Sequence, residues 1–237
     1  MMNRLKEIEN VFRNFNMPEY FGGNADEEDY LIVEDICDNL TKGLNCTMDH
    51  GVSKAVLIFN DEDWVLKIPF NSMLYYAYDP DSGEYDYNPD TAYYEKFCYA
   101  PMASKWDYCN VEYLVYQEAL ELGLECFFAE TDFYCSTRNG YPIYIQEKVT
   151  SMRNYPKFNR CSEKSETLAS KSPLTRYIEH LWVAAAIEQY GEEKVNNFFE
   201  FLSNKKYILH DLHYGNYGFR ADGSPCILDF SGWKECY

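Results

Sequence analysis

The sequence predicts an α+β fold on the strength of three patterns. Apolar residues recur at helical spacing over residues 3–16 and 110–122, which indicates amphipathic helices. The stretch 55–68 consists of two short β-rich runs joined by a polar four-residue link, which is the pattern of a hairpin. A second hairpin is indicated by the pair Asn139-Gly140, which separates two further strand-like runs.

The N-terminal region, residues 1–44, is expected to form a helical extension. The helix over 3–16 carries its apolar residues on one face: Leu5, Ile8, Val11, Phe12 and Phe15. Pro18 and the pair Gly22-Gly23 are expected to end this helix. Residues 29–42 are expected to form a second short helix.

Residues 71–108, which follow the first hairpin, are unusual in composition. They are rich in tyrosine and acidic residues, and Pro80, Pro89 and Pro101 interrupt them. No period is sustained, so we expect an irregular insertion with a short helix around 91–99. Both a solvated acidic loop whose tyrosines pack on the body and a substrate-binding segment fit this composition.

The clearest helix, over 110–122, is followed by Gly123, a residue suited to end it. Strand-like runs come next at 127–134 and 141–149. Residues 157–173 are rich in serine and lysine and poor in apolar residues, so they are expected to form a linker or mobile loop.

Two more helices are expected at 174–190 and 192–203, separated by Gly191. The last segment, 207–237, alternates short apolar runs with polar turns. No internal repeat and no long low-complexity tract is found.

Charge and hydropathy exclude several classes of protein. Of the 237 residues, 21 are Lys or Arg and 39 are Asp or Glu, and the formal net charge is −18. A surface this acidic repels phosphate backbones, so no nucleic-acid partner is expected. No apolar run approaches the roughly 20 residues of a membrane span, and no signal peptide is found, so we expect a cytoplasmic protein without a membrane partner. The nine cysteines are scattered and lack a C-x-x-C pair, so reduced thiols are expected rather than disulfides or a zinc site.

The C-terminal segment contains the residues best suited to chemistry. Asp211 and Asn216 belong to a polar loop, and Asp229 directly follows the apolar pair Ile227-Leu228, which places it at a strand end. Carboxylate and amide oxygens are the hard ligands that Mg²⁺ prefers, with phosphate oxygens completing the coordination. Asp211 is suited to accept the proton of an attacking hydroxyl or to orient that hydroxyl.

These motifs resemble those of the protein-kinase-like fold, and in particular its aminoglycoside and small-molecule phosphotransferase branch. Asp211-Leu212-His213-Tyr214-Gly215-Asn216 is similar to the D-L-H-x-G-N catalytic loop of that branch. Leu228-Asp229-Phe230-Ser231-Gly232 is similar to the I-D-F-G metal motif, with serine where glycine is usual. The resemblance implies a catalytic role for Asp211 and Mg²⁺ coordination by Asn216 and Asp229.

The N-terminal half extends the same resemblance. Val65-Leu66-Lys67-Ile68 is similar to the V-A-I-K strand, which implies that Lys67 holds the α- and β-phosphates of a nucleotide. Its implied partner is Glu112 on the following helix, with Glu118 and Glu95 as alternatives.

Two further segments complete the nucleotide site that the resemblance implies. The stretch 51–56 is similar to the turn over the phosphates, although it has one glycine where protein kinases use three. The stretch 144–149 resembles the hinge, whose backbone groups would bind adenine. The nucleotide contacts expected from these two segments are Gly51, Ser53, Gln146, Glu147 and Lys148.

The resemblance implies a two-lobed protein-kinase-like fold with a small antiparallel sheet in the first lobe and a reduced, mainly helical second lobe. The first lobe is expected at 45–149 and the second at 150–237. The second lobe is expected to be reduced, because the sequence as given has only eight residues after Asp229. ATP and Mg²⁺ are expected in the cleft between the lobes.

The implied function is an ATP- and Mg²⁺-dependent phosphotransferase that acts on an unidentified hydroxyl acceptor, either a small molecule or a protein. The acidic composition is compatible with a cationic acceptor. The alternative is a catalytically silent kinase-like module that binds a nucleotide or a protein partner. Transfer of AMP instead of phosphate stays open as a third hypothesis.

Overall fold

The structure is a computed structural model, and the part of the chain that it describes divides into two compact units of an α+β protein. Unit 1 is Met1–Asn110 with Asp132–Ile145, and unit 2 is Val111–Thr131 with Gln146–Tyr237. The described residues are 2–17, 20–21, 46–50, 53–75, 77–79, 84–86, 93–154, 161–205 and 211–232. The α+β class is therefore confirmed, whereas the helix expected at 29–42 and the predicted site residue Gly51 lie outside the described residues.

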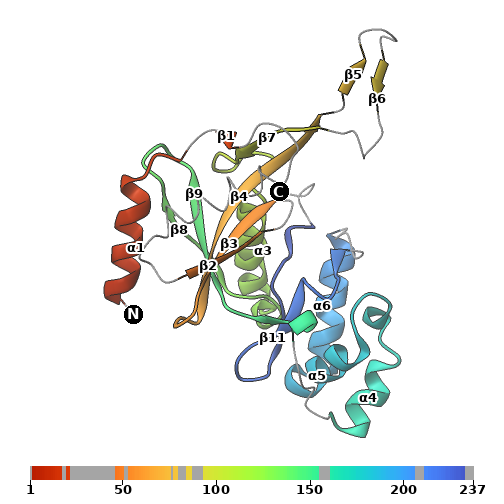
Figure 1. The fold of residues 1–237 in the computed structure, drawn as a ribbon. Coiled ribbons are helices and arrows are strands. Elements are labelled where there is room, and N and C mark those ends of the chain that lie inside the picture. The colour runs from red at the N-terminus through yellow and green to blue at the C-terminus, as the bar shows by residue number, and fades with distance from the viewer. Residues whose placement is uncertain are drawn as a thin grey trace. The chain divides into compact units, whose positions relative to one another are not determined.

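Unit 1 is built on an antiparallel sheet in the order β1-β7-β4-β3-β2, to which β9 and β8 are joined through β4 (Figure 1). Its strands are β1 (Tyr20–Phe21), β2 (Cys46–His50), β3 (Lys54–Phe59), β4 (Trp64–Tyr75), β7 (Tyr93–Tyr99), β8 (Thr131–Ser136) and β9 (Pro142–Glu147). The long strand β4 pairs with β3 through its first half and with β7 through its second. A separate hairpin of β5 (Ala77–Asp79) and β6 (Glu84–Asp86) follows β4.

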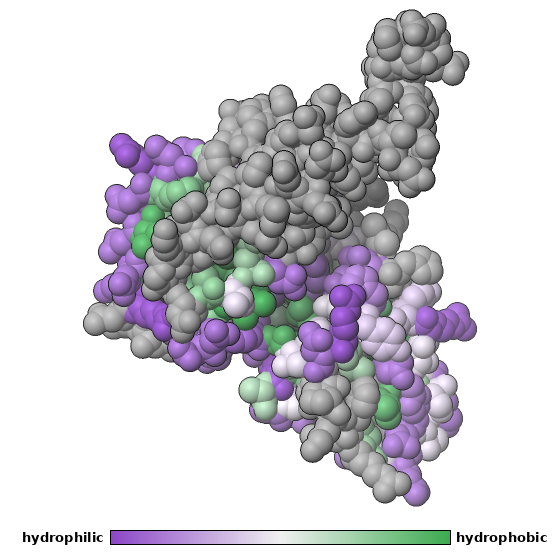
Figure 2. All heavy atoms as spheres, viewed as in Figure 1, coloured by the Kyte–Doolittle hydropathy of each residue, from purple (hydrophilic) through white to green (hydrophobic). Residues whose placement is uncertain are grey.

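Helix α1 (Met2–Asn14) covers one face of this sheet and confirms the predicted N-terminal helix. Ile8 and Phe12 are fully buried in the core of unit 1. Alternate residues of the β3–β4 hairpin complete that core: Ala55, Leu57, Phe59, Leu66, Ile68 and Phe70. The outer side of α1 is hydrophilic, as its mostly purple surface in Figure 2 shows. The helix is therefore amphipathic, as its sequence pattern predicted.

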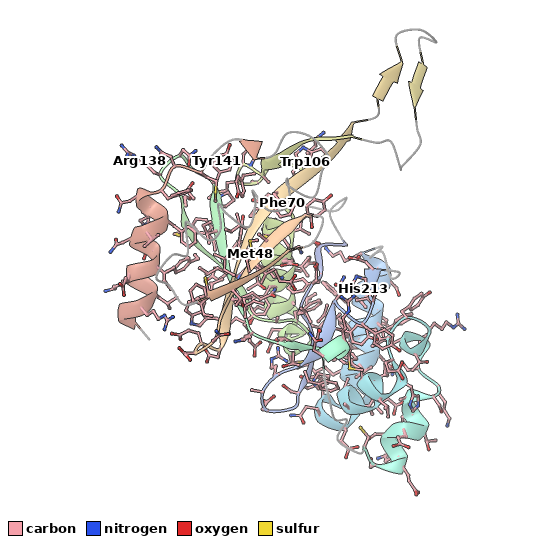
Figure 3. All side chains as sticks on the ribbon, in the orientation of Figure 1. Met48, Phe70, Trp106, Arg138, Tyr141 and His213 are labelled. Carbon is pink, nitrogen blue, oxygen red and sulfur yellow. The ribbon has the colours of Figure 1, made fainter. Side chains whose placement is uncertain are left out.

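The predicted Asn-Gly hairpin is confirmed between β8 and β9. Gly140 has a φ of 89°, a conformation that glycine adopts without the steric cost of a side chain. Asn139 also fastens α1 to this turn, because its Oδ1 accepts a hydrogen bond from the backbone N of Met17 at 2.9 Å. Arg138 and Tyr141, on either side of the turn, are labelled in Figure 3.

The helix predicted around 91–99 is wrong for its described part, because Tyr93–Tyr99 form the strand β7. This strand pairs with β4 over a register that begins at Phe70↔Tyr99, and β1 pairs with its other edge. The segment is rich in aromatic residues, which favour strands once a neighbouring strand offers pairing partners. Much of the expected irregular insertion at 71–108 is therefore sheet.

The linker expected at 157–173 is also partly wrong, because it contains helix α4 (Glu163–Ala169). Ser162 caps this helix, since its Oγ accepts a hydrogen bond from the backbone N of Ser165. Ser162 and Ser172, two of the serines that suggested a loop, thus serve as helix N-caps. The strand expected from residue 127 begins at Thr131 instead, after the short 3₁₀ helix η1 (Glu125–Phe127).

Unit 2 is mainly helical. Its helices are α3 (Tyr108–Leu122, which begins in unit 1), α4, α5 (His180–Tyr190) and α6 (Glu192–Asn204), with the 3₁₀ turns η1, η2 (Met152–Asn154) and η3 (Pro173–Arg176). A small antiparallel sheet has the order β10 (Thr150–Ser151), β11 (Tyr217–Phe219), β12 (Pro225–Ile227). Contacts group most of α3 with unit 2, whereas the kinase-like resemblance implies a first lobe over 45–149 that would include this helix.

The core of unit 2 joins α3, α5, α6 and the β11–β12 hairpin. Phe127 and Phe198 stack with ring centroids 4.3 Å apart, and Trp182 donates from its indole Nε1 to the carbonyl of Gly218 at 2.9 Å. A Cβ on Gly218 would lie 1.9 Å from the carbonyl oxygen of Thr150, so only glycine allows β10 to approach β11 this closely. No helix in the described ranges is long and apolar enough to cross a bilayer.

Three tyrosines of unit 2, one buried and two partly buried, predict a loss of stability at alkaline pH. Burial raises the pKa of Tyr190 from 10.0 to about 12, and its hydroxyl donates to the carbonyl of Pro225 at 2.9 Å. Burial likewise raises the pKa of Tyr116 and of Tyr217 to about 12. The folded state disfavours the phenolate, so this stability is fully present below pH 10.0 and is lost as the pH rises towards about 12.

We therefore expect the free energy of unfolding to fall between pH 10.0 and about 12, and Tyr190→Phe to reduce the slope of that fall. Urea midpoints measured across this interval check the prediction. The slope is the relevant quantity, because loss of the hydroxyl also removes a hydrogen bond and lowers stability at every pH. An identical slope in Tyr190→Phe and in the native chain contradicts it.

Candidate functional site

Asn216 joins the two loops that contain the predicted metal and catalytic residues. Its side-chain Nδ2 donates to the backbone carbonyl of Asp211 at 2.8 Å. Its own carbonyl accepts hydrogen bonds from the backbone N of Leu228 at 2.9 Å and of Asp229 at 3.1 Å. The loops that contain Asp211, Asn216 and Asp229 are thus brought together in unit 2.

The β11–β12 hairpin explains why residues so far apart in the sequence meet. Its register pairs Tyr217 with Ile227 and Phe219 with Pro225. In an antiparallel pair the residues just outside the register lie opposite one another, which places Asn216 beside Leu228 and Asp229. Tyr217, fully buried against Trp182 at a centroid distance of 5.9 Å, holds the base of this hairpin in the core.

The loop from Asp211 to Asn216 is closed by its own polar groups. The backbone N of His213 donates to the carbonyl of Asp211 at 2.9 Å, and the backbone N of Asn216 donates to the carbonyl of His213 at 2.8 Å. His213, labelled in Figure 3, also accepts a hydrogen bond at its Nδ1 from the backbone N of Gly215 at 3.0 Å. His213 therefore supports the conformation of the loop.

Phe230 anchors the second loop next to Glu112. Its ring is fully buried and lies 5.0 Å from that of Phe128. Its backbone N donates to Oε1 of Glu112 at 3.4 Å, and the carboxylate of Glu112 is itself fully buried on α3. Asp229, the residue before Phe230, accepts at Oδ1 from the hydroxyl of Ser231 at 3.2 Å. Glu112 thus belongs to the same cluster as the loop residues.

The three residues expected at the hinge are placed differently from one another. Gln146 is buried, and its Nε2 donates to Oγ1 of Thr131 at 2.8 Å and to Oε2 of Glu112 at 3.5 Å. The backbone N of Glu147 donates to the carbonyl of Glu130 at 2.8 Å, so this donor is already used within the chain. Lys148 is half-buried. Adenine binding at these residues stays a prediction.

Lys67 and Ser53 belong to unit 1. Lys67 lies opposite Val56 in the β3–β4 register, and only 3% of its surface is exposed. Ser53, just before β3, accepts a hydrogen bond at its carbonyl from the backbone N of Phe70 at 2.9 Å. The predicted ion pair of Lys67 with Glu112 joins residues assigned to different units and stays a prediction.

The chemistry of the donor set fits Mg²⁺. Asn216 uses Nδ2 in its bond to Asp211, which leaves its amide oxygen as the ligand atom, and Asp229 adds a carboxylate. Mg²⁺ is usually held by one or two carboxylates, with substrate phosphates and water completing the octahedron. Among the described residues no group of three or more His, Cys, Asp and Glu side chains is placed to hold a metal ion, so a site made wholly of such residues is not seen there.

Sequence reasoning missed two basic residues. Arg220 donates from Nε to both carboxylate oxygens of Glu147 at 2.9 Å, from Nη1 to the carbonyl of Cys126 at 3.0 Å and from Nη2 to that of Phe128 at 2.7 Å. Lys54 is as buried as Lys67, with 4% of its surface exposed. The alternation of the β3–β4 hairpin could have revealed Lys54, because its phase in β3 matches that of Lys67 in β4. No local pattern points to Arg220, whose partners are far away in the sequence.

The chain was compared with family models, with curated proteins and with solved structures, and no match was found in any of the three comparisons.

Proposed function

We propose that the chain is an ATP- and Mg²⁺-dependent phosphotransferase with a kinase-like fold, acting on a hydroxyl acceptor. The observation that carries the proposal is the bridging role of Asn216, which holds Asp211 and Asp229 in adjacent loops by three hydrogen bonds. A carboxylate suited to the acceptor hydroxyl and a pair of oxygen ligands for Mg²⁺ are what phosphoryl transfer needs from a protein.

Each residue has a distinct role in this proposal. Asp211 orients the acceptor hydroxyl and takes its proton as the oxygen attacks the γ-phosphorus, while the bond from that phosphorus to the bridging oxygen breaks and ADP leaves. Asn216 and Asp229 would hold Mg²⁺, which would supply positive charge to neutralise the phosphates. Lys67 binds the α- and β-phosphates through its ammonium group. Glu112 is proposed to position Lys67.

Catalysis in this scheme comes from positioning and from charge neutralisation. Phosphoryl transfer passes through a loose transition state, so the protein has little covalent chemistry to perform. The fully buried Phe230 supports such positioning, because it limits the movement of the neighbouring Asp229. The acceptor is unidentified, and a net charge of −18 is compatible with a cationic one.

Binding of ATP with Mg²⁺ is the first test of the proposal. At about 100 times its dissociation constant, ATP with Mg²⁺ should stabilise the chain by roughly 2.7 kcal/mol, and ATP with EDTA should stabilise it less. Asp229→Ala should remove most of this metal-dependent difference, because it deletes the carboxylate ligand. Thermal unfolding, measured with and without each ligand for each variant, gives the comparison.

The matched control is Asp222→Ala, which removes an exposed carboxylate of unit 2 that accepts only from the backbone and hydroxyl of Ser224 in the bonds described. It should leave the ligand-induced shift unchanged, although it lowers the unliganded stability slightly. An Asp229→Ala variant with an unaltered metal dependence refutes the ligand assignment.

The position of the label that is released separates the remaining hypotheses. Release of γ-labelled phosphate with water as the acceptor indicates phosphoryl transfer, and incorporation of α-label indicates AMP transfer. Binding of ATP without either reaction supports the silent module instead of the enzyme.

A further inference from the structure

Arg153 is fixed against the loop 211–216 by its backbone. It belongs to the 3₁₀ turn η2, which directly follows β10, and its backbone N donates to the carbonyl of Tyr214 at 3.1 Å. β10 pairs with β11 through Ser151 opposite Gly218, so the chain that leads to Arg153 runs beside the chain that leaves the loop. Both segments belong to unit 2. The position of Arg153 next to the loop is therefore set by strand pairing and does not depend on its side chain.

The side chains of Arg153 and His213 meet at Gly215. A Cβ on Gly215 would lie 2.9 Å from Cε1 of His213 and 3.6 Å from Nη2 of Arg153. Because glycine has no side chain, the imidazole and the guanidinium can both lie close to the backbone of the loop at this point. Both residues are exposed, and His213 is labelled in Figure 3. A ligand in solution can therefore reach both side chains directly.

Both side chains offer hydrogen-bond donors at this surface. Nδ1 of His213 accepts from the backbone N of Gly215 at 3.0 Å, so the proton of the neutral ring is on Nε2. The guanidinium of Arg153 is a permanently charged donor. Within the ranges that the structure describes, neither this guanidinium nor Nε2 of His213 takes part in a hydrogen bond or ion pair. The guanidinium is thus left without a carboxylate in that part of a chain with 39 acidic and 21 basic residues.

A phosphate group matches this pair of donors. The planar fork of a guanidinium bonds to two oxygens of one phosphate, and an imidazole N–H can bond to a third. The net charge of −18 repels a phosphate at long range, so short bonds to charged donors have to hold it. The loop that Arg153 and His213 flank begins at Asp211, the residue proposed to activate the acceptor. A phosphate bound here lies beside the loop on which transfer is proposed to occur.

We propose that Arg153 and His213 form a phosphate-binding site on the loop 211–216. The bound group is either the terminal phosphate of the nucleotide or a phosphate that the acceptor carries. The part of the proposal that concerns transfer rests on the proposed function, whereas the binding of a phosphate group does not require it.

Inorganic phosphate is the first probe, and NMR of the native chain is the first measurement. At constant pH and ionic strength, phosphate should shift the ring signal of His213 and the amide signal of Gly215 in a saturable way, and chloride should not. His213→Asn identifies the ring signal among the four histidines. The absence of a saturable shift at either residue overturns the proposal, and this result does not depend on the folding of a variant.

Variants of Arg153 test the guanidinium itself, with the amide signal of Gly215 as the reporter. Arg153→Met should weaken the affinity for phosphate about 10-fold, because hydrogen bonds to a charged group are lost. The backbone bond to Tyr214 remains in this variant, so the loop should keep its shape. Arg153→Lys should restore only part of the affinity, since an ammonium group lacks the planar fork. The control is Arg176→Met, which removes an exposed arginine of the same unit and should leave the affinity unchanged. Equal affinities of Arg153→Met and the native chain contradict the proposal.

Calorimetry with ATP and ADP, each with Mg²⁺, distinguishes the two sources of the phosphate. If the site holds the terminal phosphate of the nucleotide, Arg153→Met should weaken ATP about 10-fold and leave ADP unchanged. If it holds a phosphate of the acceptor, Arg153→Met should leave both nucleotides unchanged and still weaken inorganic phosphate. Either pattern supports the site.

The outcomes also separate this site from the function proposed above. Binding of inorganic phosphate that Arg153→Met weakens, in a chain that neither binds nor turns over ATP, supports the site and refutes the enzyme. Turnover of ATP in a chain whose affinities for ATP and phosphate are insensitive to Arg153→Met supports the enzyme and refutes the site. A native chain that binds neither phosphate nor ATP refutes both.

Discussion

Asp211→Asn should lower the turnover of ATP roughly 100- to 10,000-fold, which is the usual contribution of a positioned general base. The asparagine keeps the size of the side chain but does not accept a proton. The loop should keep its shape, because Asn216 and His213 bond to the backbone carbonyl of Asp211 rather than to its side chain. Release of γ-labelled phosphate from ATP, with water as the acceptor, measures the effect.

Nucleotide binding should survive in the same variant. Asn216 and Asp229, which are proposed to hold the metal, are unchanged, so ATP with Mg²⁺ should stabilise Asp211→Asn as much as the native chain. Asp222→Asn is the matched control, because it makes the same chemical change at an exposed turn of unit 2 and should leave turnover intact. Turnover in Asp211→Asn at the native rate removes Asp211 from its proposed role.

Arg220→Met should destabilise the chain by about 1.5–3 kcal/mol, the usual net contribution of hydrogen bonds to a charged group, because the ion pair with Glu147 is partly buried. The guanidinium bonds to the carboxylate of Glu147 and to the carbonyls of Cys126 and Phe128, and the methionine would leave all three without this donor. A fourth, longer bond at 3.4 Å reaches the hydroxyl of Tyr190 at the end of α5. Urea unfolding at neutral pH measures the loss.

The planar guanidinium of Arg220 makes the predicted loss of stability specific to arginine. Arg220→Lys should recover little of the loss, because a single ammonium group does not reproduce the planar fork that bonds to a carboxylate and two carbonyls together. Arg176→Met removes an exposed arginine of the same unit and should cost less than about 0.5 kcal/mol. Adding Glu147→Gln to Arg220→Met should cost less than the sum of the single changes, since the two residues share one interaction. A cost for Arg220→Met as small as that of Arg176→Met would show that the network contributes nothing.

Local sequence signals identified the elements whose cause is local. The helix α3 follows from its apolar period, and the β8–β9 turn follows from the pair Asn139-Gly140, whose glycine has a positive φ. The incorrect predictions of secondary structure concern segments whose conformation depends on a strand or helix far away in the sequence. Residues 93–99 have no strand-like period of their own, yet they pair with β4, and pairing supplies hydrogen bonds that a lone segment lacks.

The candidate site shows the same division. Its oxygen-bearing residues Asp211, Asn216 and Asp229 could be chosen from their types and spacing, because Mg²⁺ and phosphoryl transfer require such groups. The hydrogen bonds that bring their loops together could not be chosen, since Asn216 bonds through both its side chain and its backbone carbonyl. The side-chain bonds of the buried Gln146 to Thr131 and Glu112 also could not be chosen from the sequence, because all three residues come from different segments of the chain.

The amino-acid sequence by itself determined the class of secondary structure, the acidic charge and the choice of residues proposed to bind a metal and a phosphate. Periodicity, turn chemistry and side-chain type act over a few residues and can be read along the chain. Only the tertiary structure decided that Arg220 is surrounded by acceptors from three distant segments and that Lys54 is buried beside Lys67. Burial and strand register depend on contacts between residues far apart in the sequence, and these contacts form only when the chain folds.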